Sequence, residues 1–142
     1  MDQPLTIARP VEYLLSGIVS TSSIITRFIR TVRVAHADLA AVTRDLSDLR
    51  LVLELLKEET GIPPALQGQM LLVLESCGNV LIRVDSVLAQ CSRPEAWARV
   101  GRGEMEVCRE GLGSFREALG LALDVVGVYV YFFSFYLFLF CP

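Results

Sequence analysis

The chain has 142 residues, and its 13 basic and 16 acidic side chains give a formal net charge of −3 at pH 7. This length suits one domain with one hydrophobic core. The even charge balance argues against nucleic-acid binding through a basic surface. The hydrophobic fraction of 53% and the mean hydropathy of +0.50 are high for a soluble domain, and the last eighteen residues supply part of this excess.

The first predicted helix covers about residues 10–33, with Pro10 near its first turn, where a missing N–H costs nothing. The second is the clearest. Within "ADLAAVTRDLSDLRLVLELLKEE" six apolar residues follow a 3-4-3-4-3 spacing that places one seam along the helix: Leu39, Val42, Leu46, Leu49, Leu53 and Leu56. The glycine and prolines of "TGIPP" at 60–64 then end this helix.

A third helix is predicted from Pro64 to about Cys91, and Gly78 inside it indicates a close approach to another helix. "CSRPE" at 91–95 separates it from the fourth, with Ser92 and Glu95 at the spacing of a capping box. The fourth helix begins near Trp97, loosens at "GRG" (101–103) and resumes with a second seam: Met105, Cys108, Leu112, Phe115, Leu119, Ala122 and Val126.

Each segment has one apolar stripe, and the connections between the segments are short. Such stripes are buried only against one another. The sequence therefore predicts an all-α fold, an antiparallel bundle of four to five helices over residues 1–124, followed by an apolar segment over residues 125–142.

No catalytic pattern such as G-x-S-x-G, a Walker loop or H-E-x-x-H occurs in the chain. The paired carboxylates Asp45 and Asp48 stand beside arginines at helical spacing, which is typical of solvated ion-pairing faces. The single histidine, His36, falls between two predicted helices. Trp97 is either an anchor at an interface or a buried cap on the end of the bundle, and we favour the cap. We expect no enzyme activity, no cofactor and no small-molecule substrate.

The four cysteines are scattered and have no second histidine near them, so the converging ligands of a zinc site are missing: Cys77, Cys91, Cys108 and Cys141. Three of them fall on apolar helix faces, where a free thiol acts as a small hydrophobic group. This usage favours a reducing compartment, and we expect a cytoplasmic protein.

Three arginines, Arg27, Arg30 and Arg33, recur at every third position at the end of the first predicted helix. One interpretation is a patch that binds phosphoinositides or an anionic membrane surface. The other is the favourable placement of cations at a helix C-terminus, and with only three charges we favour it.

"PLTIARPVEYLLSGI" and "SSIITRFIRTVRVAHADLAAVTRDLSDLRLVLELL" resemble the fungal N-terminal domain of STAND/NLR-like and ankyrin-repeat proteins, the azaphilone pigment cluster protein L type, which is related to HeLo-like domains. "WARVGRGEMEVCREGLGSFREALGLALDVV" is similar to the last helix of that family, so the resemblance covers residues 4 to about 126.

This resemblance implies a helical signalling or effector module that recruits protein partners or self-associates. Some HeLo-type relatives permeabilise membranes with their N-terminal helix, but Arg9 and Glu12 interrupt that segment here. Family members usually continue into a disordered region, a nucleotide-binding domain or ankyrin repeats, and this sequence departs from that pattern.

The last segment, "VVGVYVYFFSFYLFLFCP" (125–142), is uncharged and holds eight of the twelve aromatic residues. As a helix of about 27 Å it would be a tail anchor that inserts residues 125–141 and keeps the bundle in the cytosol. We take five positions to mark this membrane segment: Val125, Val130, Phe133, Leu137 and Phe140.

Two other interpretations of this segment stand beside the anchor. A buried strand is the weaker one, because a helical bundle offers no sheet for it to join. Residues 127–142 are equally well explained as a translated intron, because Phe, Tyr, Leu, Val, Ser and Cys are encoded by T-rich codons. A non-enzymatic interaction module is therefore the first functional hypothesis, and a tail-anchored or membrane-active protein is the alternative.

Overall fold

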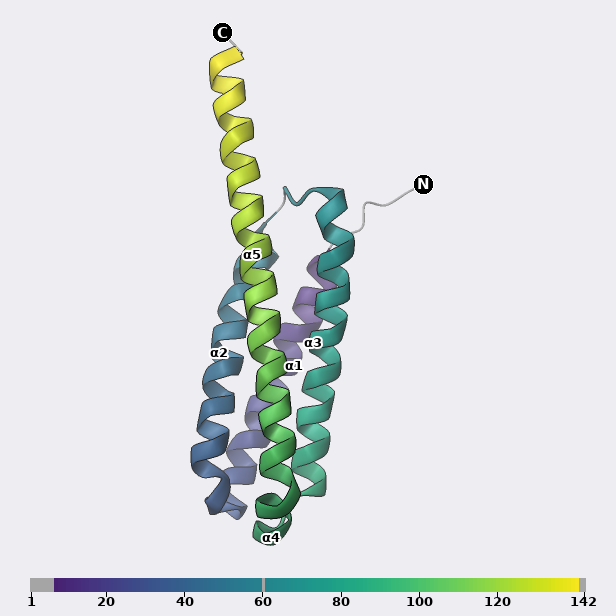
Figure 1. Ribbon diagram of the computed structural model, residues 1–142, viewed down its shortest axis with the longest axis vertical. Coiled ribbons are helices and arrows are strands. Elements are labelled where there is room, and N and C mark those ends of the chain that lie inside the picture. Colours follow the sequence, from purple (N-terminus) through teal and green to yellow (C-terminus); the bar gives the residue numbers. More distant parts are fainter. Residues whose placement is uncertain (1–6, 60, 141–142) are drawn as a thin grey trace.

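The computed structural model describes residues 7–59 and 61–140, and no strand occurs in these ranges (Figure 1). The predicted all-α fold is confirmed. The four long helices are α1 (Ala8–Thr31), α2 (His36–Glu58), α3 (Pro64–Gln90) and α5 (Arg102–Phe140). Three short elements join them: η1 (Arg33–Ala35), α4 (Pro94–Ala96) and the π-helical turn η2 (Trp97–Gly101).

The long helices form a four-helix bundle in which consecutive helices run in opposite directions, as the sequence predicts (Figure 1). Around the bundle, α1 packs against α2 and α3, and α5 packs against the same two helices. Two of the four neighbouring pairs, α1 with α3 and α2 with α5, are therefore parallel. The bundle is thus two helical hairpins laid side by side in the same orientation.

The apolar seams read from the sequence meet in the core. All six seam residues of α2 are 0% exposed, because the 3-4 spacing keeps them on one face over six turns. In α5, six of the seven seam residues are buried and Phe115 is partly buried against them. The last buried residue of α5 is Val126, which is 0% exposed.

Polar contacts fix the register of the parallel pairs. Between α2 and α5, the Asp45 carboxylate accepts a hydrogen bond from Arg109 at 2.8 Å, and Asp48 accepts one from Arg116 at 3.2 Å. Between α1 and α3, the Thr21 hydroxyl donates to Asp85 at 2.8 Å. The ion-pairing role predicted for Asp45 and Asp48 is confirmed, although their partners lie on a different helix.

Trp97, the first residue of η2, closes the end of the bundle. Its side chain is 0% exposed, and its ring centroid lies 5.4 Å from that of Phe28 in α1. The indole Nε1 donates to the carboxylate of Asp38 at 3.2 Å. The prediction that Trp97 is a buried cap is confirmed, and the polar edge of the ring has found the partner that a buried tryptophan needs.

The chain before Trp97 differs from the sequence prediction. The residue that precedes α4 is Arg93, and no side chain caps this helix start. The capping box predicted from Ser92 and Glu95 is therefore wrong, because Pro94 in the first turn already removes one N–H that would need an acceptor.

Two glycine predictions are also revised. The chain does not loosen at residues 101–103, because a π-helical turn leads directly into α5. A Cβ atom at Gly78 would lie 3.6 Å from Leu14, which is ordinary contact, whereas one at Gly17 or Gly111 would meet a neighbour at 3.3 Å. The tightest position is Gly101, where a Cβ atom would lie 2.6 Å from Cε3 of Trp97 and 3.0 Å from Cβ of Cys91.

We predict that Gly101→Ala lowers the free energy of unfolding by about 1–3 kcal/mol, because the added methyl group overpacks the site of the Trp97 ring. Chemical denaturation followed by circular dichroism measures the change. Gly103→Ala is the matched control, since nothing lies within 4 Å of its Cβ position and alanine favours the helix. Equal stability of the two variants would contradict the packing observed here.

Candidate functional site: the exposed end of α5 and an arginine-lined groove

The helix α5 is much longer than the helices it packs against. It has 39 residues, whereas α1, α2 and α3 have 24, 23 and 27. At about 1.5 Å per residue these lengths correspond to about 58 Å against about 35–40 Å. The C-terminal part of α5 therefore projects beyond the bundle as a single free helix (Figure 1).

We call residues 127–140 the tail helix. Every one of its residues is exposed, and none is charged. The predicted membrane positions are 42–66% exposed: Val125, Val130, Phe133, Leu137 and Phe140. The first of these still lies beside the bundle, and the other four lie on the tail helix. The buried-strand interpretation is wrong, since the segment is helical up to Phe140 and, apart from Val126, its described residues lie outside the core.

One helix among the described residues has the length and composition to cross a membrane, and it runs without a break from Pro94 to Phe140. An 18-residue stretch of it has a mean hydropathy of 1.9, and only 6% of that stretch is buried. Soluble monomers rarely expose a contiguous apolar surface of this kind. An exposed apolar surface of this size is typical of a site that binds lipid or another protein.

The base of the tail helix carries charges of both signs. Asp124 on α5 and Glu58 on α2 are exposed there, and Lys57 forms an ion pair of 3.8 Å with Glu12 of α1. This end is not a basic surface, so it would sit better on a zwitterionic membrane than on a strongly anionic one.

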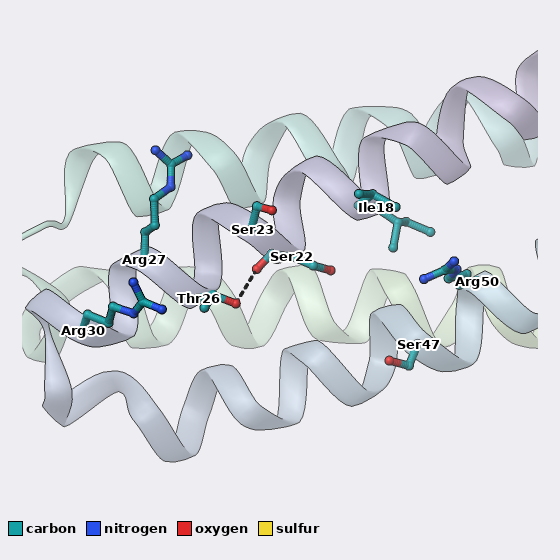
Figure 2. A pocket seen from close by; sticks show the side chains of 9 residues that line it. Ile18, Ser22, Ser23, Thr26, Arg27, Arg30, Ser47 and Arg50 are labelled. Carbon is teal, nitrogen blue, oxygen red and sulfur yellow. Dashed lines mark hydrogen bonds between the residues drawn. The ribbon is translucent and has the colours of Figure 1, made fainter.

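A separate feature, the arginine groove, lies between α1 and α2 (Figure 2). Its volume is about 680 Å³. Figure 2 shows Arg27 and Arg30 at one end of the groove and Arg50 at the other. Serine and threonine side chains line it between them, together with two apolar residues: Ser22, Ser23, Thr26, Ser47, Ile18 and Val19.

The predicted patch of Arg27, Arg30 and Arg33 is divided by the structure. The first two line the groove, whereas Arg33 lies in η1, beyond the end of α1, and does not line it. Arg50 joins them from α2. The spacing of residues in the sequence does not predict that Arg50 lines this groove, because its position beside α1 depends on how α1 and α2 pack.

The end of the groove that holds Arg27 and Arg30 is far from the tail helix. Phe28, between these two arginines in the sequence, packs on Trp97 at the closed end of the bundle. The helix from Trp97 to Val126, the last residue before the tail helix, is about 40 Å long. The tail helix and the arginines that one interpretation assigned to a membrane surface are therefore at opposite ends of the molecule (Figure 1).

At the closed end, the Asp38 carboxylate also accepts a hydrogen bond from Nε of Arg102 at 2.9 Å. Partial burial acts to raise the pKa of Asp38, but the hydrogen bonds from Arg102 and Trp97 and the charge of Arg102 outweigh it. The pKa of Asp38 is held below its ordinary value of 3.8, so this group is a structural anion.

The described cysteines have the character of core residues. Burial raises the pKa of Cys77 to about 12 and also raises the pKa of Cys108, so both thiols stay protonated near neutral pH. Cys141 lies outside the described residues. Within residues 7–59 and 61–140 no three His, Cys, Asp or Glu side chains gather in an arrangement that could hold a metal ion.

Comparison with protein-family models, with curated proteins and with solved structures finds no match to this chain.

We predict that Asp38→Asn lowers the free energy of unfolding by about 1 kcal/mol or less, since both partners of the Arg102 ion pair are partly exposed. A carboxylate whose pKa is lowered on folding stabilises the protein above its unfolded-state pKa, and this contribution is lost as the pH falls through the lowered pKa. The difference in the free energy of unfolding between wild type and variant should therefore be largest near pH 6 and become smaller below pH 3.8.

Denaturation curves at several pH values measure this difference. Glu58→Gln serves as the control, because Glu58 is exposed and forms no ion pair with any described residue. A difference for Asp38→Asn that is the same at every pH would contradict the role assigned to the ionised carboxylate.

Proposed function

We propose that this chain is a non-enzymatic helical module held at a membrane by the end of α5, with the bundle on the cytoplasmic side. The observation that carries the proposal is the unbroken helix that leaves the bundle after Val126 with every residue uncharged and exposed. The inserted segment is residues 125–141, of which residue 141 lies outside the described residues.

The energetics of insertion support this proposal. Nine residues of the tail helix are Val, Leu or Phe, each worth about −0.3 to −0.6 kcal/mol on insertion, which gives roughly −3 to −5 kcal/mol. The polar groups of Ser134 and the tyrosines reduce this gain. Tyr129 and Tyr131 lie near the base of the tail helix. In an inserted helix this part would lie at the membrane–water interface, which is the position that tyrosine prefers.

The length of the tail helix sets how the bundle would sit. Its 14 residues extend about 21 Å, less than the roughly 30 Å of a hydrocarbon core. Even from Val125 to Phe140 the helix extends only about 24 Å, so insertion brings the bundle against the headgroups and places Asp124 at the interface. Because α5 is continuous through this point, the bundle is held rigidly to the inserted segment.

The second candidate function is a signalling or effector module of the fungal N-terminal type that acts through protein partners. It is supported by a core that ends at Val126 and does not include the tail helix. On this hypothesis the tail helix either docks on a partner or is a translated intron. Sequencing of the transcript across codons 124–130 separates a genuine tail from a translated intron.

We predict that the full chain, expressed in cells, stays in the membrane pellet after carbonate extraction. Phe133→Arg, at the middle of the tail segment, should release it, because an arginine at the membrane centre costs about 2.5–3.5 kcal/mol. Circular dichroism should show the variant still folded, since Phe133 is 57% exposed and contributes nothing to the core.

Leu121→Arg is the matched control, since it adds the same charge to an exposed position of α5 beside the bundle. It should remain in the membrane pellet with the wild-type chain. If carbonate extracts the wild-type chain as completely as Phe133→Arg, the membrane role is excluded and the second candidate stands.

A further inference from the structure

The arginine groove is lined by three positive charges, and of these only Arg50 has an acidic partner among the described residues. The lining contains three arginines and no acidic residue. Arg50 forms an ion pair with Glu54 at 3.2 Å, but neither Arg27 nor Arg30 has an ion-pair or hydrogen-bond partner among the described residues. An anion in the groove would therefore meet two guanidinium groups that are free to bind it.

The surface between the arginines is built from small hydroxyl side chains. Ser22, Ser23 and Ser47 line it, and no hydrogen bond occupies their hydroxyl groups within the described part of the chain. Thr26 donates its hydroxyl hydrogen to the carbonyl oxygen of Ser22 at 3.0 Å, as Figure 2 shows. Short side chains leave the groove open, and their hydroxyls add donors between the two charged ends.

The length of the groove selects an extended ligand. Its lining on α1 runs from Ile18 to Arg30, which is about 18 Å along the helix. A single small anion cannot reach Arg30 and Arg50 together. Only a chain of negative charges would contact both ends.

The chemistry of the lining favours phosphate over an acidic helix. Guanidinium groups bind phosphate oxygens through paired, charge-assisted hydrogen bonds, and hydroxyls donate to the same oxygens. A docked helix depends on a run of apolar contacts, and only Ile18 and Val19 line the groove with apolar side chains.

The location of the groove argues for a soluble ligand. Arg27 and Arg30 lie near the closed end, about 30 Å along α1 from Ala8 at the other end of that helix. Lipid headgroups around an inserted tail helix would not reach them.

We infer that the arginine groove between α1 and α2 is a binding site for a soluble polyphosphate chain, either free or as part of a larger molecule. Arg27 and Arg30 bind one end of the chain, the hydroxyls of α1 and Ser47 contact its middle, and Arg50 binds the other end. This inference does not depend on the membrane role of the tail helix.

Isothermal titration of the full chain in neutral detergent with long-chain inorganic polyphosphate tests the inference. Binding should be more than about tenfold tighter than that of inorganic phosphate, because both ends of the groove are then engaged. The double variant Arg27→Gln/Arg30→Gln should bind about tenfold or more weakly than wild type. These exposed residues lie outside the core, so the variant should keep its helical spectrum.

The matched control is Arg93→Gln/Arg99→Gln, which removes the same charge from two exposed arginines outside the groove. It should change the affinity by no more than about twofold. Ser47→Asp, which places a negative charge in the lining, should weaken binding as the first double variant does.

Three results would overturn the inference. They are no measurable binding of polyphosphate, equal losses in the two double variants, and polyphosphate binding no tighter than inorganic phosphate. A short-chain phosphoinositide that binds more tightly than polyphosphate and requires Arg27 and Arg30 would reassign the groove to a lipid headgroup.

Discussion

Burial of four apolar seams against one another is the constraint on which this structure depends. Helices in proteins owe most of their stability to the packing of their apolar faces, and α5 depends on it further because it carries several glycines in its first half. Each seam is buried only where three other helices surround it. The seam of α5 continues to Val126, where its neighbours end, and the helix beyond that point has nothing to pack against.

The two ends of the bundle consequently have different characters. At the closed end, Trp97 is buried against Phe28, and Asp38 accepts hydrogen bonds from Trp97 and Arg102. At the other end, α5 leaves as an exposed apolar rod. The core is thus separate from the exposed apolar helix, and a change in the tail helix leaves core contacts intact.

The parallel pairing of α2 with α5 and of α1 with α3 also places the arginine groove. Because α5 and α3 occupy two sides of the bundle, α1 and α2 share an outer face that no other helix covers. Small side chains on that face, such as Ser22 and Ser47, leave a hollow between the two helices. The groove and the tail helix therefore arise from different helices and can act independently.

The sequence by itself determined the helices, their buried faces and the apolar character of the tail helix. These are local properties, since 3-4 spacing and the glycine and prolines of residues 60–64 act within a few turns. The tryptophan cap was also predictable, because a single large aromatic residue at a helix start is most favourably buried there.

Only the tertiary structure decided which helices lie beside one another. Spacing along one helix carries no information about its neighbours, so the pairing of Asp45 with Arg109 and the place of Arg50 in the same groove as Arg30 could not be predicted from the sequence. For the same reason Arg33 was grouped with Arg27 and Arg30, although it lies outside their groove. The exposure of the last part of α5 is also a tertiary property, because it depends on the neighbouring helices being shorter than α5.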